Sequence, residues 1–128
     1  MTDDGATDLT DLTQMRLRVI FGPAGMMGPG KAELLERITR TGSIAAAGRE
    51  MGMSYKRAWQ LVETMNAMFR APLVESTRGG ARGGGATVTE TGAVVLRHYR
   101  GLEAAARAAG GDHLAELEAL LADMSQGK

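Results

Sequence analysis

The sequence of 128 residues predicts a mainly α-helical fold with a small β-sheet. Residues 42–66 have the pattern of two short amphipathic helices joined by a tight turn, and residues 73–89 have that of two short strands around a glycine-rich loop. A longer helical pattern follows over residues 90–109. Two helices joined at a sharp turn and followed by a β-hairpin predict a winged helix-turn-helix domain, which we expect to span residues 15–109.

Two features are expected ahead of the first helix. Residues 1–14 are acidic and lack hydrophobic periodicity, so we expect them to be disordered. In residues 15–21 the side chains alternate, with Met15, Leu17, Val19 and Phe21 on one face and Arg16, Arg18 and Ile20 on the other. A period of two residues predicts a β-strand over this segment.

A glycine-rich connector leads from this strand to a helix expected at about residues 31–40. Leu34, Leu35 and Ile38 recur at helical spacing and should form the buried stripe of that helix. Gly42 follows it and should supply the C-terminal stop, because glycine adopts the left-handed conformation that commonly ends a helix.

The connector also resembles a phosphate-binding loop. Gly25 to Lys31 fits the frame G-x-x-x-x-G-K, which follows a strand and opens a helix in nucleotide-binding proteins. Ala32, however, occupies the position where a hydroxyl should hold magnesium, and Pro29 removes one backbone N–H donor. We therefore favour a structural connector over a nucleotide site.

The helix-turn-helix is expected within residues 42–66. Ser43 and Ser54 each precede an apolar-periodic segment and should cap its N-terminus. Gly52 lies between the two segments, where the chain must reverse sharply. The expected buried stripes are Ile44, Ala47 and Met51 in the first helix and Ala58, Leu61, Val62, Met65 and Phe69 in the second.

The outer face of the second helix carries donors, cations and aromatic rings near its N-terminus, as a recognition helix does when it enters a major groove. The residues that we expect at the DNA interface of the two helices are Ser43, Ser54, Tyr55, Lys56, Arg57, Trp59 and Gln60. Arg57 and Gln60 are the candidates for direct base contacts, since Arg suits guanine and Gln suits adenine. Trp59 could instead lie half in the core.

Residues 73–89 are expected to form the wing. The glycines of its loop allow a close approach to a phosphate, and Arg78 and Arg82 could neutralise phosphates or enter a narrow minor groove. The alternative is a hairpin with solvated arginines. We favour the wing, because residues 73–89 directly follow a helix-turn-helix.

Thr89 should cap the helix over residues 90–109, and Gly110 and Gly111 should separate it from a last amphipathic helix in residues 110–128. One face of that last helix carries Leu114, Leu117, Leu120, Leu121 and Met124. We expect this face to be a dimer contact, because DNA-binding dimers match palindromic half-sites. Packing of the face on its own domain is the alternative.

The chain has no net charge, but its charges are unevenly distributed. Residues 37–100 contain ten basic and four acidic residues, whereas the segments before and after them are acidic. This layout suits a polyanionic partner of the central segment.

The sequence offers little chemistry beyond binding. There are no cysteines, and the two histidines, His98 and His113, lack the spacing of metal ligands, so we expect no metal and no cofactor. We identify no catalytic residue and predict that the protein is not an enzyme. With neither a signal-peptide pattern nor an apolar run long enough to cross a bilayer, we expect a cytoplasmic protein.

Several short motifs resemble the DNA-binding domain of ModE-type, molybdate-responsive transcriptional regulators, which is itself similar to the winged helix-turn-helix of LysR-type regulators. The resemblance extends over about residues 15–108 and is carried by Gly42-Ser-Ile44, Gly52-Met-Ser-Tyr-Lys-Arg-Ala-Trp59, Met65-Asn66, Leu73-Val-Glu75, Gly79-Gly80, Gly83-Gly-Gly-Ala86 and Thr89-Glu-Thr-Gly92. It implies a dimer that binds operator DNA through the helix at residues 54–66 and the wing. Members of that family continue into an oxyanion-sensing module that has no counterpart here, so we do not expect molybdate to bind this chain.

The sequence therefore predicts a homodimeric transcriptional regulator that binds double-stranded DNA. The alternative is a winged-helix module that has lost DNA binding and docks a protein partner through its C-terminal helix.

Overall fold

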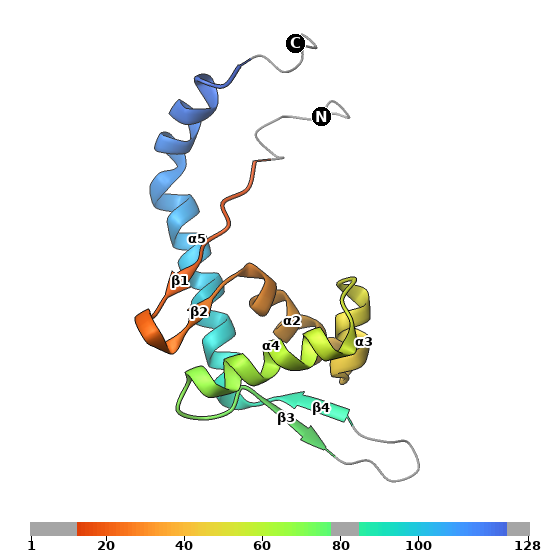
Figure 1. Ribbon diagram of the computed structural model, residues 1–128. Helices are drawn as coiled ribbons and strands as arrows, with labels where there is room; N and C mark the ends of the chain where they lie inside the picture. Colours follow the sequence, from red (N-terminus) through yellow and green to blue (C-terminus); the bar gives the residue numbers. More distant parts are fainter. Residues whose placement is uncertain (1–12, 78–84, 123–128) are drawn as a thin grey trace. The chain divides into compact units, whose positions relative to one another are not determined.

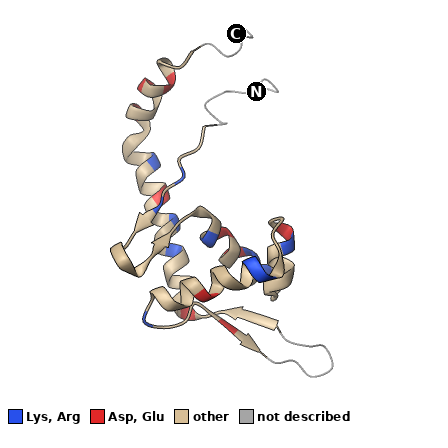
Figure 2. Cartoon of the chain, viewed as in Figure 1, with Lys and Arg blue, Asp and Glu red and all other residues tan. Residues whose placement is uncertain are grey.

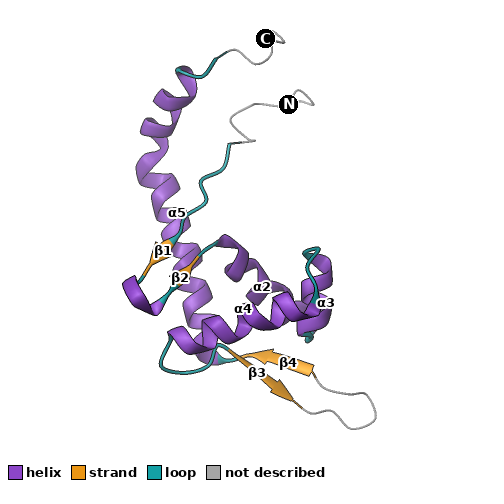
Figure 3. Ribbon diagram, in the orientation of Figure 1, coloured by secondary structure: helices purple, strands orange, loops and turns teal. Residues whose placement is uncertain are grey.

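The computed structural model describes residues 13–77 and 85–122, which fall into two compact units. Residues 17–101 form the first unit, and the second combines the chain up to Arg16 with the chain from Leu102 onward. The fold is mainly helical with a small β component, as predicted, but it has two small antiparallel sheets where one was expected (Figure 1; Figure 3). The expectations for Arg78, Arg82 and Met124 lie outside the described residues, as do most of those for residues 1–14.

A two-stranded sheet opens the first unit. Strand β1 (Val19–Ile20) pairs antiparallel with β2 (Met26–Met27), with Val19 opposite Met27. Between them lies the short 3₁₀ helix η1 (Gly22–Ala24). The strand predicted over residues 15–21 is therefore wrong in length, because only Val19 and Ile20 have residues of β2 opposite them. The predicted alternation is confirmed up to Ile20, since Leu17 and Val19 are half-buried whereas Arg16, Arg18 and Ile20 are exposed. It is wrong for Phe21, which is 46% exposed where the chain leaves the strand for η1.

Helix α2 (Pro29–Thr41) follows this sheet and ends where the sequence predicts. Gly42 has a φ of 72°, and its N–H donates to the Ile38 carbonyl at 2.8 Å, which closes the last turn. Leu34, Leu35 and Ile38 are fully buried. The helix begins two residues earlier than expected because Pro29, whose φ suits the first helical position, stands at N1.

The helix-turn-helix is formed by α3 (Ile44–Glu50) and α4 (Tyr55–Met68). Both predicted caps are confirmed: Ser43 Oγ accepts a hydrogen bond from the Ala46 N–H, and Ser54 Oγ accepts one from the Arg57 N–H, each at 3.0 Å. Gly52 has a φ of 73° in the turn between the helices. At Gly48 a Cβ would lie 2.9 Å from the Ala58 Cβ, so a glycine is needed where α3 meets α4.

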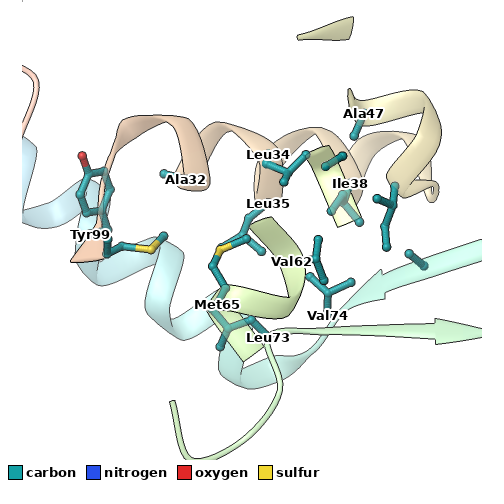
Figure 4. Packing of buried hydrophobic residues seen from close by; sticks show 14 residues of the cluster. Ala32, Leu34, Leu35, Ile38, Ala47, Val62, Met65, Leu73, Val74 and Tyr99 are labelled. Atoms are coloured by element: carbon teal, nitrogen blue, oxygen red, sulfur yellow. The ribbon is translucent and has the colours of Figure 1, made fainter. Parts of the chain in front are cut away.

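The hydrophobic core of this unit joins residues from α2, α3, α4, the wing and the first half of helix α5 (Glu90–Ala119). Figure 4 shows Leu35 of α2 close to Met65 of α4, with Leu73 and Val74 of the wing beneath them. Tyr99 extends the core toward the N-terminal segment, where its hydroxyl donates to the Leu17 carbonyl at 2.6 Å. This core fixes the orientation of α4 within the unit.

The predicted wing is confirmed as strands β3 (Val74–Thr77) and β4 (Gly85–Val88), which pair antiparallel with Glu75 opposite Thr87. Asn66 ties α4 to this hairpin. Its Oδ1 accepts from the N–H groups of Leu73 and Val74 at 2.8 and 3.1 Å, and its Nδ2 donates to the Val74 carbonyl at 3.0 Å. The wing is thereby held in register with the helix that precedes it.

Helix α5 (Glu90–Ala119) is continuous through Gly110 and Gly111, so the predicted break at these glycines is wrong. Neither glycine adopts a positive φ, and glycine costs a helix interior only about 1 kcal/mol relative to alanine. Flanking alanines and leucines therefore carry the helix through. Its predicted cap is confirmed, since Thr89 Oγ1 accepts from the Gly92 N–H at 3.0 Å.

Among the residues that the structure describes, no helix combines the length and hydrophobicity needed to cross a membrane.

Candidate nucleic-acid interface

The first two turns of α4 present a polar and aromatic surface. Lys56, Arg57 and Gln60 are exposed, whereas Ala58 and Val62 on the same turns are buried against the core. Tyr55 is 53% exposed and Trp59 is 36% exposed. Most of the Trp59 surface is thus covered, but its remaining edge is accessible beside Lys56 and Gln60, as base or sugar contact would require. The helix end nearest α3 carries the basic residues of α4 (Figure 2).

The two serines predicted for this interface hold the helix ends. The hydroxyl oxygens of Ser43 and Ser54 accept the cap hydrogen bonds of α3 and α4. Each hydroxyl keeps its own proton for donation, because a cap bond uses only an oxygen lone pair. Both groups can therefore stabilise a helix end and donate to a phosphate oxygen at once.

One hollow lies between the helix-turn-helix and the wing. It has a volume of about 240 Å³, and Ser43, Tyr55, Ser76 and Thr77 contribute polar groups to its wall. Sequence reasoning missed Ser76 and Thr77, which it treated as ordinary strand residues. The two consecutive short polar side chains at the end of β3 are the signal that could have indicated them.

A second hollow lies on another side of α4. It has a volume of about 310 Å³ and is lined by three cations, Arg18, Lys31 and Arg57, together with Gly28 and Gly30 at the start of α2. Burial lowers the pKa of Lys31 below its usual value, and the nearby charges of Arg57 and Arg18 lower it further. Sequence reasoning placed Arg57 at the interface but not Arg18 or Lys31, whose only signal was the motif that resembles a phosphate-binding loop.

The cations of the first unit differ in their partners. Arg37 and Arg40 both pair with Glu50, and Arg100 pairs with Glu36 at 2.8 Å. These contacts lower the pKa of the Glu50 and Glu36 carboxyl groups. Within the described parts of the chain, by contrast, the cations at the hollow and at the tip of α4 pair with no carboxylate; they are Arg18, Lys31, Lys56 and Arg57. Positive charge is left uncompensated where α4 meets the solvent.

The resemblance to a nucleotide-binding loop does not extend to the structure. Ala32, at the position of the magnesium-binding hydroxyl, is fully buried, and Lys31 Nζ donates to the Met26 carbonyl at 2.8 Å. In the described ranges no three side chains of the types that ligate metals are grouped together. The two hollows beside α4 are lined by hydroxyl groups and by cations, respectively.

Comparison with known families finds a match over residues 30–93, to the family described as bacterial regulatory helix-turn-helix protein, lysR family. The matched residues begin in α2 and end in the first turn of α5, so they contain the helix-turn-helix and the wing.

Characterised proteins with similar sequences include three from different bacteria. The chain is 48% identical over 82 residues to the molybdenum-pterin-binding protein MopA of Rhodobacter capsulatus. This match covers 64% of this chain and 31% of that protein. It is 39% identical over 92 residues to the molybdenum transport protein ModE of Azotobacter vinelandii, covering 72% and 33%. It is 38% identical over 71 residues to the DNA-binding transcriptional dual regulator ModE of Escherichia coli (strain K12), covering 56% and 27%. The matched segment is thus about a third of the length of these relatives.

Proposed function

This chain belongs to the lysR family of bacterial regulatory helix-turn-helix proteins, and on that premise we propose that it regulates transcription by inserting the first two turns of α4 into the major groove of operator DNA. The observation that carries this proposal is the uncompensated positive charge of Lys56 and Arg57 on an exposed helix tip beside a β-hairpin. Since its DNA lies in the bacterial cytoplasm, the protein acts there.

In this mechanism the base edges are read by Arg57 and Gln60. An Arg guanidinium donates two hydrogen bonds to guanine, and a Gln amide donates to and accepts from adenine. Tyr55 and the exposed edge of Trp59 contact sugars or thymine methyl groups. Lys56 and the hydroxyl groups of Ser43 and Ser54 hold phosphates, which fix the position of the helix without reading sequence.

The wing contributes a second contact. Ser76 and Thr77 lie at the end of β3 next to the hollow that contains Tyr55, so a duplex against α4 also meets this strand. Arg78 and Arg82 follow β3 directly in the sequence, and we assign them to phosphates or to the minor groove.

A salt titration tests the proposal against the rival function, a protein-docking module without DNA binding. If several phosphates are neutralised, the logarithm of the association constant for a 30-base-pair duplex should fall steeply with the logarithm of salt concentration, by about 0.9 for each phosphate contacted. Fluorescence anisotropy of labelled duplex provides the measurement. Weak binding that salt does not change would favour the rival.

We propose that the protein acts as a homodimer through the C-terminal half of α5 and the two leucines that directly follow it. In the second unit Leu117, Leu120 and Leu121 are 63%, 82% and 70% exposed, which is a large apolar surface for three neighbouring side chains. Sets of exposed leucines of this kind mark interaction sites.

The dimer proposal predicts that Leu117→Gln combined with Leu121→Gln shifts the protein from dimer to monomer in sedimentation equilibrium. Helicity should change little, because both side chains are exposed in the single chain, Gln is a good helix former at position 117, and Leu121 lies beyond the end of α5. The double variant Ala115→Gln and Ala119→Gln, on the same helical segment, is the matched control. A dimer that persists in the leucine variant would contradict the proposal.

Molybdate is not a ligand of this chain in our proposal, although relatives carry names that refer to molybdenum. Isothermal titration of the chain with molybdate should therefore release no heat of binding.

A further inference from the structure

The strongest feature that the proposed function leaves unused is the hollow at the start of α2. This hollow of about 310 Å³ brings together Arg18 from the segment before β1, Lys31 from the first turn of α2 and Arg57 from α4. Three segments that are distant in sequence therefore place positive charge around one space.

The wall of the hollow is open toward an incoming group. The first turn of α2 contains no acidic residue, and no side chain caps its N–H groups. A Cβ built on Gly28 would lie 3.6 Å from Arg18 Cγ, so the Arg18 stem lies over the helix start, whereas one built on Gly30 would meet nothing within 4 Å. The positive end of a helix dipole, free N–H groups and side-chain cations thus share one site, which is the combination that binds tetrahedral oxyanions.

The charges at this site are not balanced by any acid in the described part of the chain. Lys31 Nζ donates one of its three protons to the Met26 carbonyl, and the other two remain for another acceptor. Within the described residues no carboxylate lines the hollow, and the mutual repulsion of the three cations contributes to the lowered pKa of Lys31. An arrangement that repels itself in the free protein is relieved when an anion binds.

The position of the hollow relative to α4 identifies the anion. Arg57 lies on one side of the helix, in this hollow, and Tyr55 lies in the hollow next to the wing. Residues two positions apart on an α-helix are separated by about 200° around its axis, so the two hollows flank α4 on nearly opposite sides. A helix about 10–12 Å wide fills a major groove about 12 Å wide, and the phosphate backbones then pass along both of its flanks.

We propose that Arg18, Lys31 and the first turn of α2 form a seat for one DNA backbone phosphate on the flank of α4 opposite the wing. This inference rests on the proposed function, which supplies the duplex. The seat positions the protein and reads no sequence, and it gives the helix a fixed contact on each wall of the groove.

The test compares Lys31→Gln and Arg18→Gln with Arg70→Gln, which removes the same charge from an exposed residue just beyond the other end of α4. Each seat variant should weaken binding about tenfold on both specific and random duplexes and reduce the salt slope by about 1. Arg70→Gln should leave the slope unchanged. Equal slopes in all three variants would overturn the seat while leaving the proposed function intact, whereas failure of the unaltered protein to bind duplex would be a failure of the proposed function.

Neutral methylphosphonate groups placed one at a time in the duplex then locate the phosphate. At one position the neutral group should weaken duplex binding by the unaltered protein about tenfold. It should not weaken binding by Lys31→Gln any further, because that variant already lacks the contact. Equal losses in both proteins at every position would overturn the assignment to DNA.

Inorganic phosphate distinguishes a free oxyanion from the duplex as the occupant. Gly30→Asp places a carboxylate in the open part of the hollow at the second position of α2, where an acid stabilises the helix. This variant should melt no lower than the unaltered protein but should lose duplex affinity as Lys31→Gln does, with Gly30→Asn as control. Two results together would assign the seat to a free oxyanion and overturn the duplex assignment. Inorganic phosphate would raise the melting temperature of the unaltered protein but not that of Gly30→Asp, and Gly30→Asp would bind the duplex as tightly as the unaltered protein does.

Discussion

Arg57→Ala should weaken binding to the cognate duplex by about 1–3 kcal/mol, which is about 5-fold to 150-fold, and should relax the base preference at one position. The side chain is exposed, lies on the first turn of α4 and forms no ion pair within the described residues. Among residues 13–77 and 85–122, no acid thus competes for its guanidinium. Fluorescence anisotropy on the cognate duplex and on duplexes with single base changes measures both effects.

Two further variants give this result its meaning. Arg57→Lys keeps the charge but loses the planar pair of donors, so it should bind phosphates normally and still lose the base preference. Arg70→Ala, at the opposite end of α4, should change neither quantity. If Arg57→Ala weakened all duplexes equally, Arg57 would belong entirely to the phosphate seat and would have to be removed from the set that reads bases.

Gly92→Ala should destabilise the helix-turn-helix unit by about 3 kcal/mol, at the upper end of the range for overpacking. A Cβ at this position would lie 2.3 Å from the Leu73 carbonyl oxygen and 2.8 Å from Val88 Cγ1. The Leu73 carbonyl accepts from the Thr89 N–H at 2.9 Å, so moving it disrupts the joint between the wing and α5. Urea unfolding followed by the fluorescence of Trp59, the single tryptophan, provides the measurement.

Gly101→Ala is the matched control for this prediction. The same substitution in the same helix meets nothing within 4 Å and should stabilise the protein by about 0.5–1 kcal/mol, because alanine is the better helix former. Similar unfolding free energies for the two variants would show that the close approach of Gly92 to Leu73 does not constrain the fold.

Features that depend on neighbouring residues could be predicted from the sequence. Ser43 and Ser54 cap helices through hydrogen bonds to residues three positions later, and Gly42 and Gly52 adopt conformations that few other residues tolerate. Such signals are local, so a single sequence contains them. The family prediction is confirmed for the same reason, since the motifs around these residues lie within the matched segment.

Features that depend on tertiary contacts could not be predicted. Strand β2 contains only Met26 and Met27, which are too few for a period of two to be visible. It forms because the chain reverses after β1 and pairs antiparallel with it. The continuation of α5 through Gly110 and Gly111 was missed for a different reason: the helical preference of long flanking segments outweighs the cost of two glycines. The grouping of Arg18, Lys31 and Arg57 arises only when three separate segments pack together, and no spacing in the sequence encodes it.

An NMR titration of the isotopically labelled chain with a duplex obtained by selection tests the central claim most directly. If α4 enters the major groove, the amide signals of residues 54–60, 76–77 and 30–31 should shift together, while those of residues 63–68 in the second half of α4 should shift little. Shifts confined to residues 114–121, with the signals of residues 54–60 unchanged, would contradict it.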